Sequence, residues 1–422
     1  MYLTSRSRTV VSAPASDPEV ALPLPRIGVS RNVVMLGIVS LITDISSEMV
    51  SAVLPLYLVF VLGTTPLTFG FLDGLYNGVT SLVQLTAGHL ADRWERRKGL
   101  ALTGYALSAV CKLGLLAVGS VIPAIAAVLG LDRTGKGLRT APRDALISLS
   151  SQEHALGRAF GVHRALDTFG AFIGPLFAFV LLAAAPGRYD SIFVVSFCIA
   201  GCGVVLLAAA VREPAVPASA RARPTVRRAV ALLADRRMAV ATATAVALSV
   251  LTLSDAFVYL LVQRRFDIPI AWFPLLPLAT SAVYMALAIP LGRLADRLGR
   301  SRVFLIGYTP LLAGYLLLGL GAVRWWTFAL ILVLHGAYYA ATDGVLMAYI
   351  SGFIPVQLRA SGMAVLKTGT AAGAIASSVL FGAAWSAWGP TQATLIFAVA
   401  LGGVLALAAP WLLDVRAGGR RR

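Results

Sequence analysis

Runs of apolar residues, each followed by a short polar stretch, occupy most of the chain. The runs are about 20 residues or longer, which is the length that an α-helix needs to cross the hydrocarbon core of a bilayer. Twelve of them can be delimited, at 32–61, 69–90, 99–119, 122–149, 157–184, 191–211, 238–262, 271–291, 303–322, 325–350, 361–382 and 391–413. The pattern predicts an all-α integral membrane protein with twelve transmembrane helices.

The composition agrees with this prediction. Hydrophobic residues make up 58% of the chain, charged residues 13%, and the mean hydropathy is +0.81, outside the range of ordinary soluble domains. A net charge of +17 would suit nucleic acid, but most basic residues fall in alternate loops, and the loops between hold Arg188, Arg264, Arg265 and Arg324. This asymmetry is typical of membrane topology. We expect no nucleic-acid partner, and a multi-pass protein of the bacterial cytoplasmic (inner) membrane with both termini in the cytoplasm.

The polar segments divide the chain into five parts. Residues 1–31 lack an apolar core of signal-peptide length and are expected to be a cytoplasmic N-terminal tail. The segment 212–237 carries seven arginines and three prolines, which predicts a basic cytoplasmic linker. It separates a six-helix bundle at 32–211 from a second one at 238–413. Residues 414–422 are the C-terminal tail.

A short basic element occurs twice, at a spacing close to half the chain's 422 residues. It reads Gly-x-Leu-Ala-Asp-Arg and lies between two apolar runs in each copy. A duplicated element indicates two similar bundles, a design typical of proteins that rock around a central site. Glycine lets another helix approach closely, and aspartate can bind a helix N-terminus and pair with arginine. We predict a cytoplasmic latch of Gly88, Asp92, Arg93, Arg96, Arg97, Gly292, Asp296, Arg297 and Arg300.

The two copies of the element differ, because Glu95 stands where the second copy has Gly299, which predicts latches of unequal strength. A purely topological role of the basic residues is the alternative. The element is similar to the loop signature of the major facilitator superfamily (MFS), and the resemblance covers all twelve predicted helices. It implies an MFS fold, with two pseudo-symmetric six-helix bundles of a 12-helix prokaryotic branch.

A second motif lies in the apolar run at 157–184. Gly161, Gly170, Gly174 and Pro175 follow the spacing Gly-x8-Gly-x3-Gly-Pro, which resembles the helix 5 signature of antiporter branches of the MFS. Small residues permit tight helix contact, and proline bends a helix. The chain departs from that signature further on, and a generic small-residue packing face is the alternative.

Charged residues concentrate in the run at 122–149, where Asp132, Arg133, Lys136 and Arg139 follow one another. The string Gly-x4-Gly-Lys there is not a phosphate loop, because the Ser or Thr that must follow is replaced by Gly137 and no strand precedes it. Charges inside a membrane span usually face the bundle interior or a water-filled cavity, so we predict that these four residues line the cavity or take part in proton coupling. The resemblance adds that Arg133 and Gly137 match the Arg-x3-Gly element of MFS helix 4.

Two carboxylates in the run at 32–61, Asp44 and Glu48, are four residues apart and therefore share one helical face. Like charges held close in a low-dielectric site make a proton carrier plausible, whereas a nearby Arg133 would stabilise both anions. A static salt-bridge cluster with the runs at 122–149 and 157–184 is the alternative. By the half-repeat, Asp255 is a cavity candidate, as are His335 and Asp343. His163, Arg164 and Asp167 are candidates for a linked cluster, whereas Asp73 and Lys112 stay open between inward and interfacial positions.

Taken with the resemblance, these residues predict a secondary active transporter that works by alternating access around a cavity lined by helices 1, 4, 7 and 10. We expect proton-coupled export, by antiport, of a small organic compound or drug, with Asp44 or Glu48 carrying protons. A proton-coupled symporter or an exchanger of an anionic metabolite is the alternative, and a membrane sensor or channel is more distant. The expected partners are a small-molecule substrate, protons and lipid. We expect no metal, no cofactor, no enzymatic activity and a functional monomer.

Overall fold

The computed structural model describes residues 29–94, 96–152, 155–214, 231–352, 354 and 359–414. The side chains of 85–94, 359–361 and 411–414 are outside this description. Most of the predicted N-terminal tail, linker and C-terminal tail therefore lie outside the described residues.

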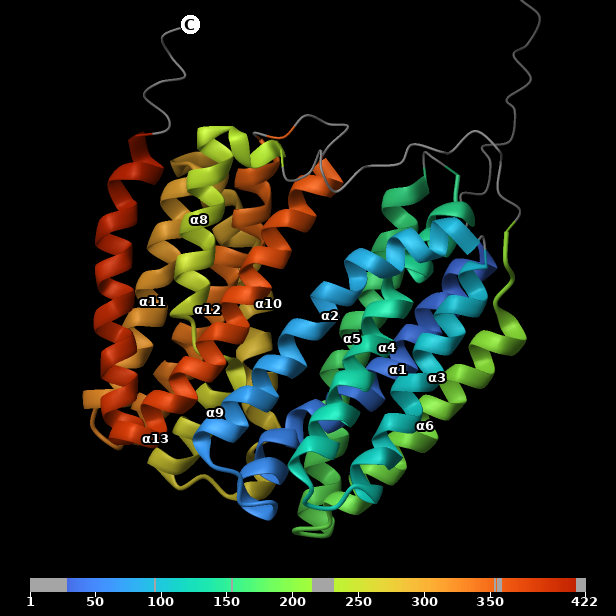
Figure 1. Ribbon diagram of the computed structural model, residues 1–422, viewed down its shortest axis with the longest axis horizontal. Helices are drawn as coiled ribbons and strands as arrows, with labels where there is room; N and C mark the ends of the chain where they lie inside the picture. Colours follow the sequence, from blue (N-terminus) through green and yellow to red (C-terminus); the bar gives the residue numbers. More distant parts are fainter. Residues whose placement is uncertain are drawn as a thin grey trace, which may run out of the picture.

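The described part is all α-helical, as predicted, and forms two bundles (Figure 1). The N-terminal bundle contains α1 (Arg31–Leu56) with its π-helical extension η1 (Tyr57–Val61), α2 (Pro66–Trp94), α3 (Arg97–Ala117), α4 (Ile122–Leu149), α5 (Leu156–Ala184) and α6 (Tyr189–Ala210). The C-terminal bundle contains η3 (Leu232–Ala234), α8 (Arg236–Val250), α9 (Asp255–Phe266), η4 (Ile270–Trp272), α10 (Leu275–Leu298), α11 (Arg300–Leu320), α12 (Trp325–Ser351) and α13 (Arg359–Asp414).

The helices account for the twelve predicted membrane crossings. In the described residues, nine helical segments are long and apolar enough to cross a bilayer. The last of them, Gly362–Pro410, has 49 residues and turns back at Gly389, whose φ is 82°, so it crosses twice. The two further crossings are α2 and α4, which have 29 and 28 residues but carry more polar side chains.

One predicted helix is interrupted. The run at 238–262 was expected to be continuous, but the structure has α8 and α9 separated by residues 251–254. Ser254 is the N-cap of α9 and its side chain accepts from the amide of Phe257, which is a favourable start for a new helix. The seventh crossing is therefore a discontinuous helix of the kind that forms binding sites in transporters.

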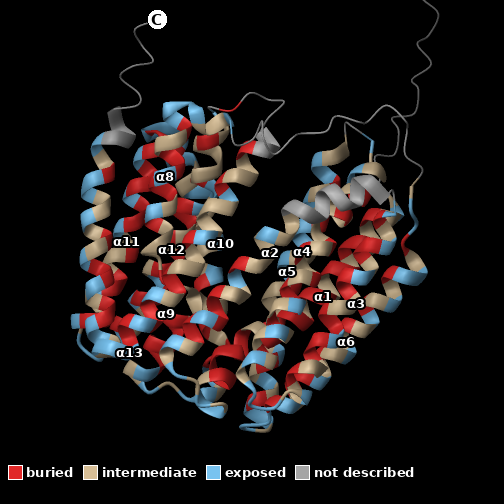
Figure 2. Ribbon diagram, in the orientation of Figure 1, coloured by how far each residue is buried: buried red, intermediate tan, exposed pale blue. Residues whose placement is uncertain are grey.

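Burial follows the bundles. Figure 2 shows buried residues concentrated inside each bundle. Large apolar side chains on the outer faces are exposed, for example Val205 at 67%, Val399 at 76% and Leu407 at 73%. Contiguous exposed apolar surface of this kind is suited to lipid, so the outer faces agree with a multi-pass membrane protein.

The two ends of the molecule differ. We call the side where α2, α4, α6, α10 and α12 end the linker side, and the opposite side the far side. The bundles spread apart toward the linker side and converge at the far side (Figure 1). There α2 packs closely on α13, and glycines make this possible. A side chain at Gly70 would collide with the Ser378 carbonyl, and one at Gly382 would collide with the Pro66 carbonyl. This arrangement leaves a cavity between the bundles that is closed from the far side.

Candidate functional site

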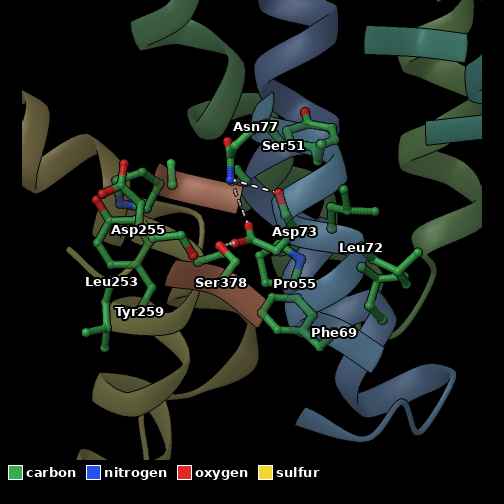
Figure 3. A pocket seen from close by; sticks show the side chains of 18 of the residues that line it. Ser51, Pro55, Phe69, Leu72, Asp73, Asn77, Leu253, Asp255, Tyr259 and Ser378 are labelled. Atoms are coloured by element: carbon green, nitrogen blue, oxygen red, sulfur yellow. Dashed lines mark hydrogen bonds between the residues drawn. The ribbon is translucent and has the colours of Figure 1, made fainter. Parts of the chain in front are cut away.

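The cavity between the bundles has a volume of about 440 Å³ and is lined by both halves of the chain. The N-terminal bundle contributes residues of α1, α2 and α5, and the C-terminal bundle contributes residues of α8, α9, α10, α12, α13 and the break at 251–254. Figure 3 shows side chains from both bundles pointing toward this space. The size is within the range of small-molecule sites. The predicted lining by helices 1, 7 and 10 holds, whereas no described residue of α4 reaches it.

The charged residues among the described lining are three carboxylates, Glu48 on α1, Asp73 on α2 and Asp255 on α9. Hydroxyl and amide groups surround them, including Ser51, Asn77, Thr252, Ser254, Ser281, Tyr259, Tyr339 and Ser378. The cavity is therefore polar and acidic. It can take up protons, cations and hydrogen-bond donors more readily than anions.

Asp255 is the first residue of α9, directly after the helix break. Its Oδ1 lies 2.8 Å from Nε2 of His335 and accepts a hydrogen bond of 2.8 Å from the hydroxyl of Tyr339, both on α12. His335 is buried, whereas the Asp255 side chain is 48% exposed. The sequence predicted both residues as cavity candidates, and the structure brings them together.

The break that places Asp255 is held by side chains from other helices. The amide of Leu253 donates to the Tyr315 hydroxyl at 2.6 Å, and the Ser377 hydroxyl donates to the carbonyl of Thr252 at 2.6 Å. Backbone groups released by unwinding must be satisfied inside a membrane protein. Tyr315 on α11 and Ser377 on α13 bond to the backbone groups of the break. The break is therefore stabilised by neighbouring helices.

Asp73 is 7% exposed and lies where the cavity meets the contact between α2 and α13. Its Oδ1 accepts from Asn77 Nδ2 at 3.0 Å, and its Oδ2 accepts from the Ser378 hydroxyl at 2.6 Å. The sequence did not decide whether Asp73 faces inward or lies at an interface. In the structure it lines the cavity and also bonds to Ser378 at the contact between α2 and α13. The signal was present in the sequence, because Asp73 stands between Gly70 and Gly74 in a helix whose glycines permit close contact.

The charges of α4 lie behind the cavity wall. Asp132 accepts from Arg133 Nε at 2.9 Å and from the Ser108 hydroxyl at 2.5 Å, and Lys112 Nζ is 4.0 Å from it. The Arg133 guanidinium stacks 3.8 Å from the ring centre of Tyr76, a residue of the lining. These buried ions face the interior of the N-terminal bundle, so they are compensated by one another. This differs from the predicted position on the cavity surface.

Lys136 is the cation of α4 that lies nearest a lining carboxylate, with its Nζ 3.8 Å from Oε1 of Glu48. Both side chains are about one third exposed, at 32% and 31%. The sequence analysis treated Glu48 and Asp44 as one pair, but the structure places them in different surroundings. Glu48 lines the cavity, whereas Asp44 is buried and pairs with Arg139 at 3.5 Å.

A polar cluster joins α1, α4 and α5 toward the linker side. Asp167 accepts from the Ser40 hydroxyl at 2.6 Å, and Arg143 lies 3.6 Å from Asp167 and 3.0 Å from Asp144. Arg164 adds an exposed contact of 3.9 Å to Asp167. The static cluster that the sequence offered as an alternative was one of Asp44 and Glu48 with α4 and α5; this cluster joins the same three helices through other residues. The buried His163 lies in the same helix, α5, and Asp343 is exposed on α12, away from the lining.

The glycine motif of α5 divides into two parts. Gly170 packs on the Leu41 carbonyl, and Gly174 packs on the Ile45 carbonyl and Cβ of Glu48, so these glycines bring α5 onto α1. Pro175 lines the cavity. No described residue of another helix comes within 4 Å of the Cβ position of Gly161, so this glycine makes no close helix contact with the described part of the chain.

The predicted latch is described mainly in its second copy. Arg300 binds Asp296 at 3.0 Å and donates to the Ala348 carbonyl at the end of α12 at 2.9 Å. Arg297 is exposed. Among the described residues, no other helix comes within 4 Å of the Cβ position of Gly292, so they do not make the close approach predicted for it.

In the first copy, the side chains of Gly88, Asp92 and Arg93 lie outside the described residues, as does Glu95. Arg96 precedes α3, and the amide of Arg97 donates to Glu213 Oε1 at 2.5 Å. The N-terminus of α3 is therefore capped by an acid that follows α6, a favourable charge for a helix N-terminus.

Comparison with known proteins shows which family has this fold. The family model described as Major Facilitator Superfamily matches residues 36–286 and 270–422. An uncharacterized MFS-type transporter of Methanocaldococcus jannaschii is 29% identical over 369 residues, which is 84% of this chain and 89% of that protein. An uncharacterized protein of Mycobacterium tuberculosis is 32% identical over 165 residues, 39% of this chain and 40% of that protein.

Solved structures share the fold at low sequence identity. A variant of the nucleoside transporter NupG has a TM-score of 0.79 at 14% identity, covering 90% of this chain and 99% of its own. A variant of the peptide transporter POT has a TM-score of 0.73 at 16% identity, covering 92% of this chain and 95% of its own. With the two bundles, the central cavity and the matched family model, the chain belongs to the Major Facilitator Superfamily of membrane transporters.

Proposed function

We propose that this transporter couples the inward movement of protons to the export of a small organic compound that carries a cationic nitrogen. The observation that carries the proposal is the charge of the cavity, whose charged lining residues are Glu48, Asp73 and Asp255. A carboxylate in a low-dielectric site is stabilised by an opposite charge close to it. A cationic cargo supplies that charge.

The same carboxylates explain antiport. A carboxylate can hold a proton or pair with a cation, and each occupant weakens the binding of the other. Binding protons from one side and the cargo from the other therefore gives exchange. Glu48 and Asp255 are the proposed proton carriers, because their side chains are 31% and 48% exposed. Asp44, the other predicted carrier, is less suited because Arg139 pairs with it in the bundle interior.

The packing of α5 supports the antiporter assignment. Gly170 and Gly174 lie on the backbone of α1 next to Glu48, so movement of α5 is transmitted to a proposed proton carrier. This is the motif that resembles the helix 5 signature of antiporters. Alternating access would then close the linker side and open the far side around the cavity.

The second candidate is uptake or exchange of an anionic metabolite, and one observation favours it. Lys136 lies 3.8 Å from Glu48 with its side chain 32% exposed, so one cation stands near the cavity. The other cations of α4 are engaged, Arg133 by Asp132 and Arg139 by Asp44. Three lining carboxylates against one nearby lysine favour the cationic cargo.

We further propose that the linker side faces the cytoplasm, with both chain termini there, in the bacterial inner membrane. The described ends of the basic linker and the second copy of the basic latch lie on that side, which agrees with the positive-inside rule. The proton gradient would be the energy source, and a monomer would suffice because both halves of the cavity come from one chain.

The test is transport by the purified protein in liposomes with an acidic lumen. We expect protons leaving the lumen to drive accumulation of ethidium, a cationic dye, and to leave a carboxylated anionic dye of similar size outside. Ethidium uptake should alkalinise the lumen, measured with a trapped pH indicator. Release of the anionic dye, together with protons, from liposomes preloaded with it would instead establish the symport alternative.

A further inference from the structure

The contact between α2 and α13, which we call the seam, joins the two bundles by close backbone contact. Side chains at Gly70 and Gly74 would meet the carbonyls of Ser378 and Ile375, and a side chain at Gly382 would meet that of Pro66. Glycines of this kind let helices lie close and slide. Polar links that fix the relative position of the two helices are therefore decisive.

Asp73 supplies such a link. Its carboxylate accepts from the Ser378 hydroxyl at 2.6 Å, between residues 305 positions apart in the chain. The same carboxylate lines the cavity, as Figure 3 shows. Hydrogen bonds to a charged acceptor are among the stronger ones in proteins. One residue thus belongs both to the cargo site and to the seam.

An aromatic layer closes the far side about one helical turn away. Phe69 on α2 lies 4.9 Å from Phe257 on α9, which in turn lies 4.8 Å from Phe381 and 5.8 Å from Trp385 on α13, between ring centroids. We call these four residues the aromatic plug. Phe69 lines both the cavity and a second hollow of about 170 Å³ bordered by Gly63 and Thr64 on the far side. The plug therefore separates the two spaces.

The hydrogen bond between Asp73 and Ser378 and part of the aromatic plug lie on the same two helices, α2 and α13. Phe69 stands four residues before Asp73, and Phe381 stands three residues after Ser378, so each pair lies on neighbouring turns of one helix. Holding Asp73 against Ser378 sets the register of α2 on α13. That register keeps Phe69 in edge-to-face contact with Phe257, which has Phe381 beside it.

We propose that Asp73 couples occupancy of the cavity to opening of the aromatic plug. With the cavity empty, the bond to Ser378 holds the plug closed. A cation in the cavity attracts the carboxylate, which lines the cavity with 7% of the residue exposed, and draws it away from Ser378. Ser378 is then released and the far side can open. The nature of the occupant rests on the proposed function, whereas the role of the bond to Ser378 does not.

The first test measures access to the cavity from the far side. In a variant with Cys111, Cys198 and Cys202 replaced by serine, Ser51→Cys places a thiol in the cavity lining. A membrane-impermeant maleimide is added to the far side of vesicles. We expect Ser378→Ala to raise the labelling rate on the order of tenfold, the factor for loss of one such hydrogen bond. Ser377→Ala is the matched control, because its hydroxyl donates to Thr252 within the C-terminal bundle.

The second test uses Asp73→Asn, in which the amide oxygen can still accept from Ser378. We expect its labelling without a ligand to stay close to that of the parent. Ethidium should speed labelling of the parent severalfold and leave the Asn variant unchanged. Equal labelling of the Ser378 and Ser377 variants overturns the proposal. If ethidium neither binds the parent in a thermal-shift measurement nor changes labelling, the cationic cargo fails, and the comparison of the serine variants still decides the role of the bond.

Discussion

The Asp255 carboxylate and the His335 imidazole lie 2.8 Å apart, although 80 residues separate them in the chain. Asp255 is 48% exposed in the cavity, and His335 is 3% exposed inside the C-terminal bundle. The pair therefore joins a solvated acid to a buried base, at the N-terminus of a helix that begins in the middle of the membrane. A change of charge at Asp255 is transmitted directly to α12.

This geometry makes Asp255 a testable proton carrier. We expect Asp255→Asn to abolish transport driven by a pH gradient and to spare exchange of bound cargo across liposomes without a gradient, because Glu48 and Asp73 still line the cavity and can pair with the cargo, whereas the amide cannot carry a proton. Tyr339→Phe is the matched control, since it removes one bond to the same oxygen and keeps the carboxylate. Undiminished gradient-driven flux in the Asn variant would exclude Asp255 from coupling.

Glu48 and Asp44 are expected to respond differently, although the sequence places them on one helical face. Glu48→Gln should remove coupling to the pH gradient and leave folding intact, because Glu48 is 31% exposed beside Lys136. Asp44→Asn leaves the buried Arg139 without its counter-charge, and breaking a buried pair costs about 3–5 kcal/mol. Thermal unfolding and liposome flux, measured on both variants, separate the two effects. A stable Asp44→Asn protein that has lost coupling alone would assign the proton to Asp44.

The buried ions of α4 predict a structural role for Arg133. Arg133→Ala leaves Asp132 with Lys112 at 4.0 Å as its remaining cationic neighbour in the described residues, so we expect a loss of about 3 kcal/mol in stability. Binding of cationic and anionic cargo should fall equally in whatever protein folds. Arg133→Lys is the comparison, because it keeps the charge and loses the paired guanidinium geometry. Selective loss of anionic cargo would instead place Arg133 in the binding site.

The features that could be predicted from the sequence are those that depend on local patterns along the chain. Apolar runs delimited the helices, and the half-repeat placed Asp255 at the cavity, which it lines, whereas His335 is buried behind it and is not among the described lining residues. The break in the seventh crossing could not be predicted, because the groups that satisfy it, Tyr315 and Ser377, come from distant helices. The role of Asp73 depends likewise on Ser378, 305 residues away. The ions of α4 were expected at a cavity surface because a charge inside a span usually faces one; here their partners within the bundle satisfy them.

The glycines of α5 give a last prediction, which distinguishes a glycine that packs against α1 from one that does not. Gly174→Ala puts a methyl group against the Ile45 carbonyl and Cβ of Glu48, and overpacking of this kind costs about 1–3 kcal/mol. We expect lower thermal stability and weaker proton-driven transport, because the displaced residue is a proposed proton carrier. Gly161→Ala is the matched control in the same helix, where the Cβ position is open and alanine favours the helix by about 1 kcal/mol. Equal tolerance of both substitutions would show that α5 does not position Glu48.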